Sequence, residues 1–452
     1  MNNLNSEPIT DQFDQPGFPG FDGLFASTTL AYIAQMQEAG IPITFGYISD
    51  AHDQHGKAGE IHATRGPGEA DYVQQLKNYD EAFGKFFERL AKAGIDKSNT
   101  LFVFTVEEGD HFVGSQPTNS NCDGVNTPCT YSLVGEVNGN LTGLLATQQE
   151  ITTPFTVHAD MAPTIYLNGN PSRNSSVARA FGRAVSKLTA VNPYTGQTDN
   201  MTVALADPVE MDLLHMITAD PQRTPTLAMF AQPDYFLFTG AANCTAPCIT
   251  VSTTPATSTF AWNHGGIQPE IATIWLGLVG PGVSNRVQDD STWSDHADVR
   301  PTMLSLLGLQ DTYIHDGRVL TETIEEHVQP VRGRSRRQPV CSQCDTLKQL
   351  ASVYKQINAP FGQLGMDSLK VSTAALASDT TDDVTYIALT DRILKWTDQR
   401  DEIAAEMKAM LNGAVFNEKV FNEVRGRQLI NQAQALLEEA NSCAGNPVAC
   451  AQ

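Results

Sequence analysis

Acidic and imidazole side chains cluster at three places in the sequence. The first cluster follows the apolar run that ends at Ile48 and contains Asp50, His52, Asp53 and His55. Carboxylate oxygens and imidazole nitrogens are the ligands that zinc and related divalent metals favour. The alternative is a turn whose aspartates bond their own backbone. Four such residues in six positions favour the metal site.

The second cluster follows another apolar run and contains Glu107, Glu108, Asp110 and His111. Neighbouring residues of a regular strand point to opposite faces. Asp110 and His111 can therefore converge only in a loop, as ligation of one metal would require. We expect such a loop here.

The third cluster is the sequence Trp262-Asn263-His264-Gly265-Gly266. A single histidine is commonly a hydrogen-bonded structural residue. The two glycines after His264, however, would let the backbone approach a ligand closely. His264 is therefore a third candidate ligand.

The elements that must position these clusters alternate between helix and strand. Apolar spacing predicts helices over 27–39 and 69–93, each followed by an apolar strand, over 41–49 and 100–105. Strands so continuously apolar are typical of a parallel sheet covered on both faces. We therefore predict an α/β fold, a mostly parallel sheet sandwiched by helices. Both clusters would then lie at the carboxyl rim of the sheet, where ligands bind.

The remaining chain divides by composition. Residues 112–150 are rich in Gly, Asn, Ser and Thr and predict a loop-rich excursion rather than core, within an insertion that spans 112–260. Strand-like runs then lead to a helix over 299–307, which completes a core over 1–330. The basic stretch 331–340 predicts a linker, and 341–452 a helical appendage, without histidine, that packs or holds a partner.

A short internal repeat links two parts of the core. The heptapeptides HADMAPT at 158–164 and HADVRPT at 296–302 agree at five of seven positions. Asp160 and Asp298 could each cap a helix whose first turn accepts the proline. We favour this structural interpretation over a ligand role.

Composition excludes several classes of function. The 452 residues carry a formal net charge of −22, which disfavours nucleic-acid or anionic-lipid binding. With 41% hydrophobic and 18% charged residues the chain is globular, and no apolar run reaches the roughly 20 residues that span a bilayer. A polyanionic substrate would need a local positive centre, such as a metal.

The eight cysteines form four close pairs: 122 with 129, 244 with 248, 341 with 344, and 443 with 450. This spacing favours local disulfides and an extracytoplasmic location, periplasmic or secreted. A zinc ribbon or reduced thiols are the alternatives, but only one pair has CxxC spacing. The first ten residues lack the features of a signal peptide, so we expect an exported chain with a segment upstream of Met1.

Together the three clusters resemble the alkaline phosphatase superfamily, most closely its nucleotide pyrophosphatase/phosphodiesterase branch and related bacterial phosphoesterases. The resemblance covers roughly residues 16 to 325. The matching motifs, in order, are Asp50 to His55 with Gly66-Pro67, Asp110-His111, His264-Gly265, Gly280-Pro281-Gly282, Asp298 to Thr302, and Asp316-Gly317-Arg318.

The resemblance implies two divalent metals, commonly zinc, with manganese as the alternative. One metal would take Asp50 or Asp53 with His55 and His264. The other would take Asp110 and His111. The choice among Asp50, His52, Asp53 and His55 stays open, and Glu107 or Glu108 could substitute for Asp110.

The family also needs a nucleophilic Ser or Thr at a helix start. Thr28 and Thr29 are the weak candidates here, because an N-cap role is the commoner explanation for such hydroxyls. We therefore expect that the nucleophile lies upstream, in a longer exported enzyme.

The predicted function is metal-dependent hydrolysis of a phosphomonoester or phosphodiester, a small-molecule substrate. The alternative is a metal-binding or surface-interaction protein without turnover. A sulfatase is disfavoured because no Cys-x-Pro-x-Arg sequence occurs.

Overall fold

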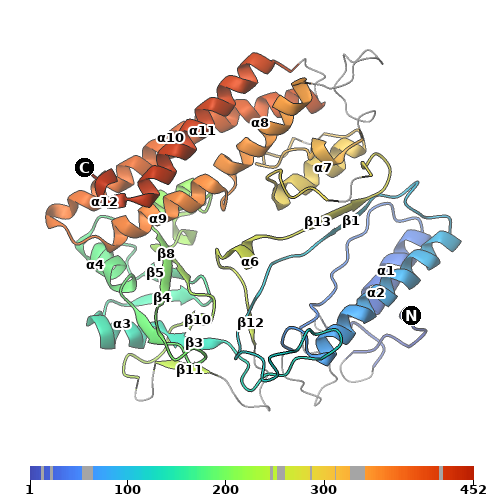
Figure 1. Ribbon diagram of the computed structural model, residues 1–452, viewed down its shortest axis with the longest axis horizontal. Coiled ribbons are helices and arrows are strands. Elements are labelled where there is room, and N and C mark those ends of the chain that lie inside the picture. Colours follow the sequence, from blue (N-terminus) through green and yellow to red (C-terminus); the bar gives the residue numbers. More distant parts are fainter. Residues whose placement is uncertain are drawn as a thin grey trace.

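A computed structural model describes the chain except residues 12–14, 21–23, 53–64, 245–247, 252–259, 286–287, 311, 326–341 and 417–420, and the side chains of 342–344. The long C-terminal helices run along the upper edge of the view, and the two N-terminal helices lie together at its right (Figure 1). The helices are α1 (Ala26–Glu38), α2 (Ala70–Lys92), α3 (Leu141–Gln149), α4 (Ser176–Val185), α5 (Pro208–Leu213), α6 (Pro269–Ala272), α7 (Val299–Leu306), α8 (Ser342–Asn358), α9 (Gln363–Ala377), α10 (Val384–Phe416), α11 (Glu423–Gly445) and α12 (Pro447–Cys450). Four 3-10 turns are η1 (Pro221–Arg223), η2 (His296–Asp298), η3 (Thr321–Thr323) and η4 (Thr381–Asp383).

The described strands form small, separate sheets. β4-β5-β9-β8 is antiparallel throughout, β10-β3-β11 is mixed, and three further sheets are strand pairs: β1 with β13, β12 with β2, and β6 with β7. The strands are β1 (Phe102–Thr105), β2 (His111–Phe112), β3 (Val137–Asn140), β4 (Phe155–His158), β5 (Thr164–Leu167), β6 (Thr189–Val191), β7 (Thr198–Asn200), β8 (Thr202–Ala206), β9 (Leu227–Ala231), β10 (Tyr235–Phe238), β11 (Ile249–Val251), β12 (Trp262–Asn263) and β13 (Leu276–Val279).

The predicted α/β fold, with its mostly parallel sheet sandwiched by helices, is therefore wrong. Within the described residues only β10 and β3 pair in parallel. Each residue of β9 is buried, yet β9 lies in an antiparallel sheet. A continuous apolar run thus indicates that both faces of a strand are covered. It does not indicate whether the strand pairs in parallel or antiparallel.

Several predicted elements are present. The helices over 27–39, 69–93 and 299–307 correspond to α1, α2 and α7, and the strand over 100–105 contains β1. Residues 41–49 are extended but pair with no described strand, so the strand predicted there is wrong. The excursion over 112–150 is wrong in part, because Val137 and Leu141, on β3 and α3, are fully buried.

The N-terminal helices have a small core of their own. α1 and α2 pack against each other, and Leu30, Phe86 and Phe102 join them to β1. Both helices end in a left-handed glycine, Gly40 and Gly94, as the sequence suggests. This core fixes the position of β1, and the residues of the second cluster follow β1 in the chain.

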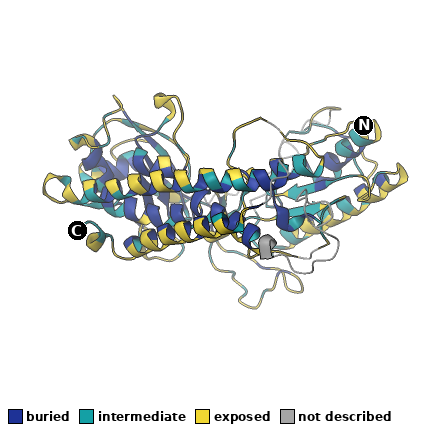
Figure 2. Ribbon diagram, turned by 90° about the horizontal axis from the view of Figure 1, so that it is seen from above, coloured by how far each residue is buried: buried dark blue, intermediate teal, exposed yellow. Residues whose placement is uncertain are grey.

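The C-terminal helices are not an appendage. α9 packs on β8, and one continuous core contains Leu205 of β8, Phe181 of α4 and Trp396 of α10. Figure 2 shows stripes of buried residues along these long helices. Arg179 of α4 is 1% exposed and donates to the carbonyls of Ala375 and Leu376, both at 3.2 Å, at the end of α9. Arginine at helix-terminal carbonyls is favourable.

A buried charge network joins α8 to the segment around α7. Lys355 of α8 lies 2.8 Å from the Asp298 carboxylate, which also accepts from the Arg318 amide at 2.7 Å. Arg318 in turn pairs with Glu322 at 2.7 Å. Such a network persists because each charge has a partner. Gly317 is required beside it, since a Cβ there would lie 1.8 Å from the Ala297 carbonyl oxygen.

The two heptapeptides adopt different structures. A helix, α7, follows Asp298 as predicted, but the Asp298 side chain does not cap it; Asp298 is instead the third residue of a capping box with Asp295 that opens the 3-10 turn η2. Asp160 is followed by strand β5, so the helix predicted after it is wrong.

Three of the four expected disulfides are present: Cys122–Cys129, Cys244–Cys248 and Cys443–Cys450. The pair Cys341 and Cys344 and the predicted linker 331–340 lie outside the described residues or side chains. In the described part of the chain, no helix combines the length and apolar composition that crossing a membrane requires.

Glu210 makes the stability of the fold depend on pH. It is fully buried in α5, Ser368 donates to its Oε1 at 2.6 Å, and its Oε2 has no partner among the described residues. Burial raises the pKa of Glu210 from 4.5 to about 8, against the opposing effect of Ser368. The folded protein therefore holds this proton over a pH range in which the unfolded chain has released it.

We expect the free energy of unfolding to fall as pH rises from about 5 to about 9 through this group, because the folded state binds the extra proton. Glu210→Gln, which mimics the protonated acid, should remove that dependence and gain on the order of 2 kcal/mol over wild type at about pH 9. Urea unfolding at several pH values measures both. Equal pH dependence in wild type and variant would contradict the burial argument, and Glu402→Gln, at an exposed position, is the control.

Candidate functional site

Pairing of β2 with β12 brings two of the sequence clusters together. His111 lies opposite Asn263, and Phe112 lies opposite Trp262. Asp110 directly precedes β2 and His264 directly follows β12, so antiparallel pairing places these two residues side by side. β2 and β12 are each only two residues long. Regular pairing stops at Asp110 in one segment and at His264 in the other.

Glu108, Asp110 and His264 form the candidate site. His264 Nδ1 lies 2.9 Å from Glu108 Oε1 and 3.4 Å from Asp110 Oδ1. One potential ligand atom from each of the three residues lies within 4.8 Å of the others. This is the spacing that one cation can bridge.

The charges of the site are strongly coupled. Hydrogen bonds to Asp110 and Glu108 raise the pKa of His264 to about 10, although burial opposes them. Burial acts to raise the pKa of Asp110, but hydrogen bonds to His264 and His52 outweigh it, and the net pKa is lowered. A hydrogen bond with Glu108 raises the pKa of Glu107. The imidazolium of His264 thus supplies the positive charge that these carboxylates need.

Asp110 carries a poorly satisfied acceptor. Its Oδ1 is shielded from solvent and has the His264 Nδ1 at 3.4 Å, without a closer hydrogen bond from the described residues. An acceptor of this kind costs free energy unless a donor or a cation meets it. Two carboxylates and one imidazole also match the ligand preference of divalent zinc or manganese. The residues therefore fit a metal ion.

His52 approaches the same carboxylate from the first cluster. Its Nε2 lies 3.3 Å from Asp110 Oδ2. Its ring stacks on Trp262 with centroids 4.8 Å apart, and Tyr72 stacks on Trp262 at 5.9 Å. The negative charge of Asp50 contributes to raising the pKa of Tyr72, so Asp50 also lies near this group. Aromatic stacking holds His52 beside the site.

His111 turns away from the site. Its Nε2 lies 3.0 Å from Asp234 and its Nδ1 lies 3.2 Å from Glu270. Burial lowers the pKa of His111, but these two carboxylates outweigh it and the net pKa is raised. Consecutive residues at a strand start point to opposite sides. The expected convergence of Asp110 and His111 on one metal therefore does not occur.

Other expected residues lie apart from the cluster or outside the description. Thr28 and Thr29 are buried in α1, and the Thr29 hydroxyl donates to the Tyr47 carbonyl at 2.6 Å, which suits a structural role. Asp53 and His55 fall among the residues that are not described.

Two acids near the site were not found from the sequence. Burial raises the pKa of Glu136 to about 7, and the charge of His264 acts to lower it. Gly265, with φ of 83°, allows Asp160 to approach, because a Cβ would lie 3.0 Å from Asp160 Oδ1. The repeated heptapeptide contains Asp160, but its pattern indicated a helix cap. Glu136 stands in a loop-like sequence without any pattern that marks it.

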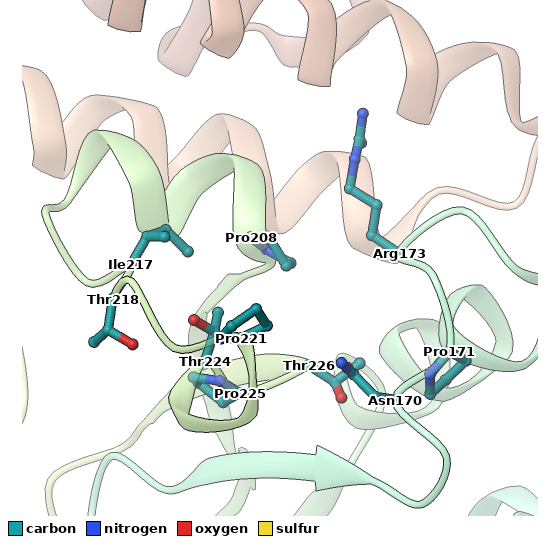
Figure 3. Close-up of a pocket in the computed structure, with 10 residues that line it drawn as sticks. All are labelled: Asn170, Pro171, Arg173, Pro208, Ile217, Thr218, Pro221, Thr224, Pro225 and Thr226. Carbon is teal, nitrogen blue, oxygen red and sulfur yellow. The ribbon is translucent and has the colours of Figure 1, made fainter.

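A pocket of about 260 Å³ lies elsewhere, between the loop at 170–173, the start of α5 and the loop at 217–226 (Figure 3). It offers neither carboxylate nor imidazole among its lining side chains. Arg173, its single charged residue, donates to the Tyr386 hydroxyl at 2.9 Å. The pocket therefore lacks the groups that the candidate site has.

Comparison with models of known protein families found no match, and a search of curated proteins also found none. The resemblance to the alkaline phosphatase superfamily thus stays an expectation that depends on the order of the motifs. The geometry of the site carries the functional argument instead.

The metal-free site should hold its proton at neutral pH. We expect the His264 imidazole to stay protonated well above its ordinary pKa of 6.5, with a midpoint near 10, because two carboxylates accept from it. Glu108→Gln should lower that midpoint by about one unit or more. NMR titration of the histidine resonances in chelator-treated protein measures this. A midpoint near 6.5 in both proteins would show that the three residues do not interact in solution.

Proposed function

We propose that Glu108, Asp110 and His264 bind a divalent cation, zinc or manganese. The convergence of these three side chains, with one potential ligand atom of each within 4.8 Å of the others, is the observation that carries the proposal, because one cation could contact all three. Glu108 Oε and His264 Nδ1 would complete the protein ligands. His264 must release its proton before its nitrogen can bind, so affinity should rise with pH.

We further propose that the site hydrolyses phosphate esters. The support is the order of motifs shared with the alkaline phosphatase superfamily, together with a concentrated acidic site in a chain of net charge −22. An anionic substrate needs a local positive centre there. A bound divalent ion supplies that charge and acts as a Lewis acid toward a phosphoryl oxygen.

The side chains around the site could orient a ligand and donate a proton. His52, held by its stack on Trp262, can orient the Asp110 carboxylate. Glu136, with a pKa near 7, can hold a proton at neutral pH and give it to a leaving oxygen. Thr28 and Thr29 are buried in α1, so we assign attack on phosphorus to water rather than to either hydroxyl.

We place the protein in an oxidising compartment, periplasmic or extracellular. Three disulfides support this location, because such bonds persist where thiols are not kept reduced. The rival function is a metal-binding protein without turnover. The two functions predict different results only in the second experiment below.

The first experiment measures metal content. Purified protein dialysed after loading with zinc or manganese should retain about one equivalent, and Asp110→Asn or His264→Ala should lower this at least tenfold. His158→Ala, an exposed histidine at the end of β4, is the matched control and should retain the metal. Equal metal content in all four proteins would rule out the site.

The second experiment measures hydrolysis of p-nitrophenyl phosphate and its bis-ester. We expect metal-dependent turnover that chelation abolishes and that Asp110→Asn lowers by about a hundredfold. Thr28→Ala should stay within about threefold of wild type, because water attacks. Retained metal without turnover would favour the rival function. Loss of turnover in a folded, metal-loaded Thr28→Ala protein would instead restore the threonine nucleophile.

A further inference from the structure

Residues 41–48 run extended along α1, and no strand of the described part of the chain lies beside them. Gly46 lies directly on the helix, since a Cβ there would come within 2.3 Å of Ile33 Cδ1. Thr44 Oγ1 accepts a hydrogen bond from Gln37 of α1 at 3.1 Å. Thr44 and Gly46 therefore lie on the side of the segment that faces the helix.

The odd-numbered residues face solvent. Ile41, Ile43, Phe45 and Tyr47 are 47%, 61%, 83% and 42% exposed. Side chains two residues apart share one face of an extended chain, so these four form an apolar stripe. A contiguous exposed apolar stripe commonly marks an interaction surface.

One backbone edge of this segment also lacks partners. The amides of Thr44 and Gly46 and the carbonyls of Pro42 and Thr44 make no hydrogen bond to any residue that the structure describes. Alternate residues direct their polar groups to the same edge of a strand. The segment is not a strand within one chain, but it presents a row of unpaired backbone groups, and such rows act as templates for another strand.

The sequence of the segment is complementary to itself. In an antiparallel pair with a twofold axis at Thr44, Ile41 lies opposite Tyr47 and Ile43 lies opposite Phe45. Both are pairs of an aromatic with a β-branched side chain, which stabilise antiparallel strands. Pro42, which has no amide, would lie opposite Gly46 and still accept through its carbonyl.

Charge also permits this pairing. Residues 41–48 contain no charged side chain, so the seam brings no like charges into contact. The rest of the chain, at −22, repels a second copy over distance, and salt screens that repulsion. We propose that two copies of this protein associate through antiparallel pairing of residues 41–48.

The seam is short, so association should be weak, with a dissociation constant on the order of 10 µM. Sedimentation velocity of the full chain from about 1 to about 100 µM should show the monomer converting to a dimer. Raising sodium chloride from about 0.02 to about 0.3 M should strengthen the dimer several-fold. A dimer held by charge pairs would show the opposite response.

Two variants test the seam. Phe45→Lys and Ile43→Lys each place a charge in the stripe and should weaken association at least tenfold. Both positions are exposed, so we expect the variants to fold. Ile314→Lys, at a loop position that is 95% exposed, is the matched control and should associate like wild type.

Hydrogen exchange separates this seam from any other interface. The amides of Thr44 and Gly46 should exchange at least tenfold more slowly in concentrated wild type than in Phe45→Lys. A wild type that stays monomeric to about 100 µM would overturn the proposal, as that result would leave the stripe to another occupant. A dimer that survives both lysine variants, or that leaves these two amides unprotected, would overturn it as well.

Discussion

The two-residue pairing of β2 with β12 is the contact on which the candidate site depends. It joins parts of the chain that are far apart in sequence and sets Asp110 beside His264. The carboxylates gathered there repel one another and need a positive charge in their midst. In the protein alone the His264 imidazolium provides it, and a divalent cation would compete with that proton for the same oxygens. Strand pairing and local electrostatics thus act together, because the pairing creates the repulsion that the His264 imidazolium relieves.

The sequence predicted individual elements better than their arrangement. α1, α2 and α7 follow from apolar spacing and their terminal residues, which are local properties. The direction of strand pairing is not local, and β9 shows that a fully buried strand can lie in an antiparallel sheet. The heptapeptides around Asp160 and Asp298 make the same point, since nearly identical residues precede a strand in one case and a helix in the other.

The candidate site was predictable to the extent that its residues stand in clusters. Asp110 could be found because acids and an imidazole follow an apolar run there, and His264 because two glycines follow it. The partners of His111 could not, since Asp234 and Glu270 lie more than a hundred residues downstream. Glu136 was equally hidden, because its raised pKa comes from burial by distant parts of the chain.

The contact of α9 with β8 and α4 has a consequence for how the chain is made. The strands β4, β5, β8 and β9 leave the ribosome well before α9 and α10, yet α9 packs on β8 and both helices share one hydrophobic core with these strands. Arg179 likewise has no carbonyls to meet until residues 375 and 376 are synthesised. During translation or export the apolar strands in the middle of the chain are therefore exposed until these helices are made. Proteins in such a state aggregate readily. A chaperone that binds this region would be most useful in the interval before the last hundred or so residues emerge.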